Sequence, residues 1–467
     1  MLFNTPIFFV FFAIFFLLYS FVFLKRYPRL LLIVVGSCIF YAGWNYRFIP
    51  LLVFSAVVDY FLAIAIAAAQ DRRRRQLLLS LSIAVNLGVL ATFKYADFAI
   101  QSVVDLLQFL GFEANASLLN IVLPVGISFY TFQSMSYTID VYRGHMQPHK
   151  GLLQFTAALS FFPQLVAGPI LRAREILPQL EKIPIAQWSE VKHGLLLISV
   201  GLLKKTIADL LGLQVDSIFG QETPVTTLQA WTGAIAFAGQ IYGDFSGYTD
   251  MAIGLALMLG FKIPINFRLP YFASSPIDFW RRWHISLSSW LRDYLYISLG
   301  GNRRYRYRNI MITMLLGGLW HGAAWTYVVW GFFHGLIIAL SHWLSQLALF
   351  KSFVDQPKWL VRMCKWALTF YLVLLGWVIF RADTMTAAMD MIAAMHFATT
   401  LSGDAISLGL ILSVTALVFM HGFDALILHK GEAIEKRAWL LWPLLFLLQL
   451  LSFFVGAPSD AFIYFQF

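Results

Sequence analysis

Two histidines lie in surroundings where an ionisable side chain could do chemistry. His284 ends the aromatic and basic stretch FWRRWH, and His321 lies within the small-residue stretch GGLWHGAAW. A neutral imidazole can take the proton of a hydroxyl group as that hydroxyl attacks an acyl carbon, which is general base catalysis. Either histidine could instead be a buried structural residue, and spacing alone favours that interpretation for His284. The two are 37 positions apart with no carboxylate motif between them, so we predict no metal site.

His321 is the stronger candidate because it lies in a long uncharged segment. Residues 310–350 contain no Lys, Arg, Asp or Glu, and their length favours two membrane spans joined by a turn. If Arg308 marks the cytoplasmic interface, the 13 residues of helix from Arg308 to His321 place His321 about 20 Å inside the membrane. That distance reaches the middle of a hydrocarbon core about 30 Å thick. An ionisable side chain at that depth is costly and is a functional candidate. His334 lies in the same segment, where a structural role is favoured.

Five arginines follow or precede His284 closely in the sequence: Arg281, Arg282, Arg292, Arg303 and Arg304. The planar guanidinium group matches phosphate oxygens, so these side chains could bind an anionic cofactor that enters from the cytoplasm. They could instead anchor the chain to anionic lipid headgroups. Spacing alone favours the lipid interpretation and leaves the cofactor interpretation open.

The residues around His284 are expected to be helical, in a segment near 275–308 that is too polar to span a membrane. Ser275 can cap the helix and Pro276 fits its first position. At 100° per residue, five apolar side chains share one face: Trp280, Trp283, Leu287, Trp290 and Leu291. We therefore predict an amphipathic helix that lies at the membrane interface or re-enters the protein.

Composition fixes the class of protein that must position these residues. Of 467 residues, 60% are hydrophobic and 12% are charged, against about 25% charged in an ordinary soluble domain. A soluble core cannot bury so much apolar surface with so few charges to cover it. This excludes a soluble enzyme, a disordered chain, a disulfide scaffold and a nucleic-acid binder. We predict an all-α polytopic membrane protein with about nine to twelve spans.

Basic clusters indicate how the chain is oriented. The apolar run 7–24 is followed by Lys25 and Arg26, and two further runs end at the cluster 72–75, which contains four arginines. Cytoplasmic loops carry excess Lys and Arg, so the N-terminus is predicted to lie outside and both clusters inside. No linker separates a soluble domain, and the whole chain, 1–467, reads as one membrane domain. The +10 net charge is explained in the same way.

Several polar residues interrupt apolar runs outside this region. Asp244 and Tyr248 lie in IYGDFSGYTDM, and Lys204 and Lys205 interrupt the run 194–213. Each could form a structural ion pair or mark a helix end, and each could also line a cavity. The structural interpretation is favoured for all of them.

The two histidine motifs carry a family resemblance. FWRRWHISLSSWLRDYLYISLGGNR, at 279–303, and LLGGLWHGAAWTYVVWG, at 315–331, strongly resemble the membrane-bound O-acyltransferase family. The resemblance is closest to its bacterial polysaccharide O-acetyltransferase branch, with a motif core at 240–335. It extends from the first span to about Arg381, and the spans within 382–467 are the least similar to the family.

The resemblance implies a ring of tilted helices around a central tunnel in the inner membrane. His321 falls on the essential histidine of the family, and His284 on the histidine of its second motif. Acetyl-CoA from the cytoplasm is the implied donor, bound through the arginines. An exported polysaccharide such as alginate or cellulose is the implied acceptor. An extracytoplasmic partner of the SGNH-hydrolase kind would relay the acetyl group.

The remaining expectations concern the tunnel and the alternatives. Five side chains are expected to line the tunnel: Trp280, Trp283, Trp320, Asp244 and Tyr248. A transporter or channel of a polysaccharide export machine is the alternative from another class, because it too would need polar residues at membrane depth. A scaffold that only anchors such a machine is a third reading, and would tolerate loss of both histidines.

Overall fold

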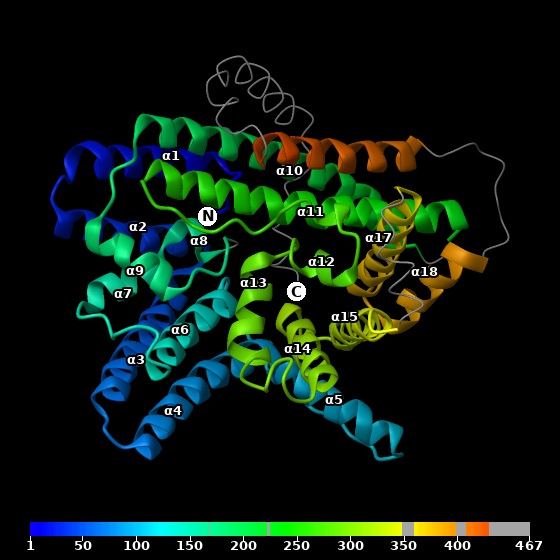
Figure 1. Cartoon of the computed structure of the whole chain (residues 1–467), viewed down its shortest axis with the longest axis horizontal. Helices are drawn as coiled ribbons and strands as arrows, with labels where there is room; N and C mark the ends of the chain where they lie inside the picture. Colours follow the sequence, from blue (N-terminus) through cyan, green and yellow to red (C-terminus); the bar gives the residue numbers. More distant parts are fainter. Residues whose placement is uncertain (167, 222–224, 348–358, 398–407, 429–467) are drawn as a thin grey trace. The chain divides into compact units, whose positions relative to one another are not determined.

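The structure, a computed structural model, describes residues 1–166, 168–221, 225–347, 359–397 and 408–428 (Figure 1). Across these ranges the regular elements are helices, with no strand. Five stretches of helix are long and apolar enough to cross a membrane: Arg26–Ala68, Arg72–Phe109, Trp325–Leu344, Trp359–Arg381 and Leu408–Leu428. The all-α, polytopic class is therefore confirmed. The number of nine to twelve spans stays a prediction, and the apolar run at 440–454 lies outside the described residues.

The chain packs as two compact units whose segments alternate along the sequence. Unit 1 contains residues 1–195 and 251–264, and unit 2 contains residues 196–250 and 265–467. The two long helices α10 (Trp188–Phe219) and α11 (Thr227–Met258) each contribute residues to both units. Each unit is described separately, and the interpretation of the chain as one membrane domain stays a prediction.

Unit 1 begins with long apolar helices and ends with short ones. Its elements are α1 (Pro6–Leu17), η1 (Leu18–Val22), α2 (Arg26–Asn45), η2 (Tyr46–Phe48), α3 (Ile49–Ala68), α4 (Arg72–Leu90), η3 (Ala91–Tyr95), α5 (Ala96–Phe109), α6 (Ile127–Tyr142), α7 (Leu152–Ser160), α8 (Phe162–Leu165) and α9 (Ala173–Lys182). Local signals set several starts: Pro6 lies in the first turn of α1, and the Asp71 side chain caps α4 by accepting from Arg74 N–H.

Unit 2 carries both histidine motifs. After α10 and α11 its elements are η4 (Pro270–Phe272), α12 (Pro276–Trp280), α13 (Ile285–Trp290), η5 (Leu291–Tyr296), α14 (Arg306–His321), α15 (Trp325–Leu344), α17 (Trp359–Arg381), α18 (Met385–Phe397) and the helix Leu408–Leu428. Helices flank the GGLWHGAAW stretch as expected, because α14 ends at His321 and α15 begins at Trp325. Of the two expected spans, α15 is long and apolar enough to cross a membrane, whereas a crossing by the 16-residue α14 stays a prediction.

Small residues bring α14 and α15 into close contact. A Cβ atom on Gly318 would lie 2.2 Å from the Tyr327 carbonyl oxygen, and one on Gly331 would lie 2.3 Å from the Met314 carbonyl oxygen. Real Cβ atoms do not approach backbone so closely, so any larger residue would force the helices apart. The glycines therefore fix the position of His321 relative to α15.

The expectation of one continuous amphipathic helix after Ser275 is corrected. Ser275 does cap the start, accepting from Asp278 N–H, and Pro276 occupies the first turn. The helix then stops at Trp280, and the chain turns through His284, whose φ of 42° lies in the left-handed region. Helical structure resumes as α13 and widens into the π-helix η5. Trp280 is thereby separated from the apolar face that it was expected to share with residues beyond the break.

Candidate active site

A neighbouring segment, and not local helix propensity, holds the backbone around His284. Asn266 accepts from Ile285 N–H through its backbone carbonyl, at 2.9 Å, and from Ser286 N–H through its side chain, at 3.1 Å. The Ser286 hydroxyl donates to the same Asn266 oxygen at 2.9 Å. These bonds satisfy the first N–H groups of α13, where a side-chain cap is missing. A residue other than glycine at positive φ is strained, and such positions cluster at functional sites.

His284 is completely buried among aromatic rings. Its ring centroid lies 4.6 Å from that of Phe245 and 5.7 Å from that of Trp320, and the side chain has no exposed surface. The histidine lies outside the five long apolar helices. Burial disfavours the charged imidazolium and lowers the pKa of His284 to about 3. The side chain is therefore neutral at physiological pH, so it can donate only through a neutral tautomer.

His321 ends α14 and contacts rings from three helices. Its ring lies 5.1 Å from Trp320 on α14, 5.0 Å from Trp330 on α15 and 5.3 Å from Phe380 on α17. The side chain is 4% exposed. The His284 ring is 6.4 Å away, centroid to centroid. The two histidines that the sequence singled out are thus neighbours.

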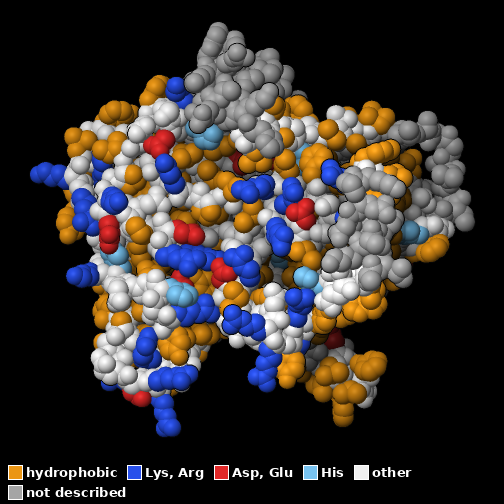
Figure 2. Space-filling view, in the orientation of Figure 1, with side chains coloured by type: hydrophobic (Ala, Val, Ile, Leu, Met, Phe, Trp, Pro, Cys, Tyr) orange, Lys and Arg blue, Asp and Glu red, His pale blue; other side chains and the backbone are white. Residues whose placement is uncertain are grey.

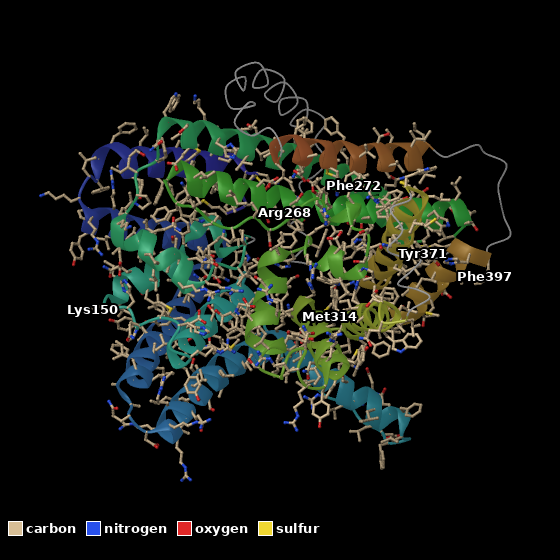
Figure 3. All side chains as sticks on the ribbon, in the orientation of Figure 1. Lys150, Arg268, Phe272, Met314, Tyr371 and Phe397 are labelled. Atoms are coloured by element: carbon tan, nitrogen blue, oxygen red, sulfur yellow. The ribbon has the colours of Figure 1, made fainter. Side chains whose placement is uncertain are left out.

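A cavity of about 280 Å³ opens beside His321. Its apolar wall comes from α12, α13, η5, α14 and α15, and includes Leu287, Leu291 and Met314, the last of which is labelled in Figure 3. Its polar lining consists of Arg281, Ser288, Arg292, Tyr296, Asn302, Thr313, His321 and His342. No carboxylate is among the lining residues. A histidine at one wall of a mainly apolar cavity, with arginines in the same lining, suits an anionic ligand that carries a short apolar group.

The cavity separates the five candidate arginines into two sets. Arg281 and Arg292 line it, although the Arg292 guanidinium also pairs with Asp293 at 2.7 Å. Arg282 instead pairs with Asp278 at 2.9 Å. Arg303 and Arg304 are not among its lining residues, and the Arg304 guanidinium lies 5.1 Å over the Tyr305 ring.

The five residues that were expected to line a tunnel also fall into different places. Trp280 lines the cavity, whereas Trp283 and Trp320 are buried behind it. The Asp244 carboxylate on α11 lies 3.1 Å from Lys205 Nζ on α10, and Tyr248 is fully buried. Neither Asp244 nor Tyr248 lines this cavity.

Sequence reasoning missed several residues of this site, among them Trp330, Asn302 and His342. Trp330 contacts His321 and lines the cavity, and Asn302 and His342 contribute to its polar lining. The Asn302 side chain accepts from the Tyr296 hydroxyl at 2.7 Å and from Arg306 at 3.1 Å. Trp330 lies within the motif stretch 315–331, which was the available signal for it. His342, which lies outside both motif stretches, carried no comparable signal.

The comparisons with known proteins agree with this arrangement. The model of the membrane-bound O-acyltransferase family matches residues 147–382. A probable alginate O-acetylase of Pseudomonas putida is 44% identical over 401 residues, covering 85% of this chain and 80% of the relative. A peptidoglycan O-acetyltransferase of Helicobacter pylori is 38% identical, with the same coverage of both chains. A teichoic acid D-alanyltransferase of Bacillus subtilis is 27% identical and covers 56% of this chain and 69% of the relative.

These matches define this polytopic helical protein as a membrane-embedded acyltransferase. The chain belongs to the membrane-bound O-acyltransferase family. The family match ends at residue 382, next to Arg381, where the resemblance in the sequence fades. Family membership favours the enzyme over the transporter and scaffold alternatives.

Proposed function

We propose that this enzyme transfers acetyl groups from cytoplasmic acetyl-CoA for the O-acetylation of an exported polysaccharide. The observation that carries the proposal is the cavity that joins His321 to Arg281 and Arg292 beside the buried His284. The relatives named for alginate and peptidoglycan acetylation support acetyl as the group and a polysaccharide as the class of acceptor.

His321 is the general base of the proposed reaction. Its imidazole takes the proton of the attacking hydroxyl group as the new C–O bond forms at the thioester carbon. The C–S bond then breaks, and the same imidazolium returns the proton to the departing sulfur, so that the thiol leaves and the base is regenerated. The rings around His321 exclude water, which limits hydrolysis of the thioester.

His284 stabilises the same step without exchanging a proton. The buried imidazole is neutral, and its ring centroid lies 6.4 Å from that of His321. We assign it the role of orienting the thioester carbonyl or of donating to the oxyanion of the tetrahedral intermediate. Its strained backbone, which Asn266 braces, would hold that orientation while substrates exchange.

Arg281 and Arg292 bind the phosphates of the donor. Acetyl-CoA brings the thioester, and its anionic head matches guanidinium groups in a lining without carboxylates. The position of Arg281 and Arg292 in the lining supports these two arginines over Arg282 and Arg304, which are not among the lining residues. The cavity is small for a whole coenzyme, so it would hold the acetylated arm while the head lies toward the cytoplasm.

The remaining features complete the proposal. The protein lies in the inner membrane with its N-terminus outside, as its basic clusters indicate. The acceptor is alginate, peptidoglycan or a similar exported polysaccharide, reached through an extracytoplasmic SGNH-like partner. These features rest on the resemblance in the sequence and on the names of the relatives.

Radiolabelled acetyl-CoA tests the proposal with the purified full-length protein in lipid vesicles. We expect the label to leave CoA, by transfer to an added polysaccharide acceptor or by slow hydrolysis. Acetyl-CoA that stays intact in the presence of both acceptor and extracytoplasmic partner would contradict the proposal and favour a transporter.

A further inference from the structure

The helix α5 has two chemically different faces. A polar stripe at helical spacing contains Asp97, Gln101, Asp105 and Gln108, and apolar residues together with Ser102 occupy the rest of its surface. None of its residues is buried. The helix has 14 residues, which is about 21 Å and too short to cross a hydrocarbon core about 30 Å thick.

The segment after α5 folds back along the helix. The Asp97 carboxylate accepts from the backbone N–H groups of Leu119, at 2.7 Å, and Asn120, at 2.9 Å. The Gln108 side chain donates to the Ala114 carbonyl at 3.0 Å. Residues 96–122 therefore form one structured unit, which we call the α5 arm. Its polar stripe holds the returning segment, which leaves the apolar face of the helix uncovered.

The apolar face of the arm is large and exposed. Phe109 is 86% exposed, and the apolar side chains of Val103, Leu106 and Leu107 on the helix and of Leu110 and Phe112 directly after it are exposed as well. In Figure 2 apolar side chains cover the projecting end of α5, which lies apart from the other helices of unit 1 in Figure 1. Contiguous exposed apolar surface of this kind marks an interaction site.

Charge and length indicate where the arm lies. Helices α4, η3 and α5 form one apolar stretch of 38 residues, about 57 Å long and nearly twice the hydrocarbon thickness. The 19 residues of α4 alone span about 28 Å, from the arginine cluster at 72–75 to the π-helix η3. Residues 95–142 contain no Lys or Arg, and such segments are typical of the non-cytoplasmic side.

We propose that the α5 arm lies flat in the lipid–water interface of the non-cytoplasmic leaflet, with its apolar face among the acyl chains. Amphipathic helices bind membrane surfaces in this way. The apolar face surrounds most of the helix, which fits the continuous acyl boundary better than the limited patch of a protein partner. The acidic stripe contains no basic side chain, so the arm fits zwitterionic headgroups and is not drawn to anionic ones. The leaflet assignment rests on the proposed orientation.

Spin labels on the full-length protein in phosphatidylcholine nanodiscs test this proposal. In a background with Cys38→Ser and Cys364→Ser, one label is placed at Phe109→Cys on the apolar face. A matched label at Gln101→Cys lies on the polar face of the same helix. We expect collisions with oxygen to dominate at position 109, and collisions with a water-soluble nickel chelate to dominate at position 101.

Three results would overturn the proposal. Access of the nickel chelate at both positions would place the helix in water. If the chelate reaches position 109 in the protein alone and no longer does so once the extracytoplasmic partner is added, the apolar face is a protein interface. Oxygen preference at both positions would place α5 inside the hydrocarbon core. The leaflet is tested separately in intact cells, where an impermeant thiol reagent should label Gln101→Cys from outside, and failure to label would reverse the assignment. None of these measurements requires acetyl transfer, so their outcome is independent of the proposed activity.

Discussion

The imidazole rings of His284 and His321 lie 6.4 Å apart although the residues are separated by 36 others in the sequence. His321 lines the cavity, whereas His284 is buried beside it against Phe245 and Trp320. This asymmetry supports the different roles proposed for the two histidines. His321 would be the base that meets the substrate, and His284 would be a neutral group that orients or polarises it.

His284→Ala should lower kcat by about 10²- to 10³-fold, the usual cost of one lost oxyanion donor. KM for acetyl-CoA should change little, because the proposed role of His284 acts on the reacting carbonyl and not on the phosphates of the donor. Steady-state kinetics with labelled acetyl-CoA measures both values. Unchanged turnover at saturating donor would place His284 among structural residues.

The pH profile provides a second readout for His284. Burial lowers its pKa to about 3, so the group is already neutral throughout the range from pH 5 to 9. His284→Asn should therefore lower the rate by a similar factor at every pH in this range, without moving the midpoint of the profile. A limb near neutral pH that disappears in the variant would show that His284 titrates in catalysis.

Neutralising Arg281 or Arg292 should raise KM for acetyl-CoA. Charge-assisted hydrogen bonds contribute about 1.5–3 kcal/mol each, so losing one should weaken binding by about 10- to 100-fold. Because the phosphates are remote from the reacting carbon, kcat should stay nearly constant. Arg304→Gln is the matched control outside the cavity, and should leave KM unchanged. If all three variants alter only protein level, the arginines anchor lipid and the donor binds elsewhere.

The ionic cluster of unit 2 should stabilise the fold. Lys204 pairs with Asp250 at 2.6 Å and with Asp424, which also accepts from Tyr242, so the cluster ties the helix Leu408–Leu428 to α10 and α11. Lys204→Met leaves two carboxylates without this cation, whereas Asp424→Asn leaves Lys204 its other partner. Thermal unfolding in detergent should show a lower midpoint for both, with the larger shift for Lys204→Met. Equal midpoints for wild type and both variants would show that the cluster does not support the fold.

Local signals predicted much of the chain correctly. Ser275 and Pro276 start α12 as expected, because a cap and a first-turn proline act within one turn of helix. The turn between α14 and α15 was expected, because the uncharged segment 310–350 is too long for one span. The apolar composition indicated the polytopic class, because a chain with this many apolar and this few charged residues can cover its apolar surface only with lipid.

Contacts between distant segments were beyond sequence reasoning. The left-handed turn at His284 depends on Asn266, which reaches α13 from an irregular segment before η4. The separation of Arg281 and Arg292 from Arg282 depends on which side chains meet the cavity once the helix is broken. The periodicity of apolar residues assumes one continuous helix, so it could not predict the break between α12 and α13.

The acetylation of the polymer by a His321→Ala variant tests the central claim most directly. The measurement compares polysaccharide acetylation in cells that carry the wild type or the variant at equal membrane level, with insertion and folding checked on the same samples. If His321 is the base, acetylation is abolished while the variant inserts and folds normally. Acetylation at the wild-type level in a folded His321→Ala protein would remove this histidine from the mechanism and contradict the account.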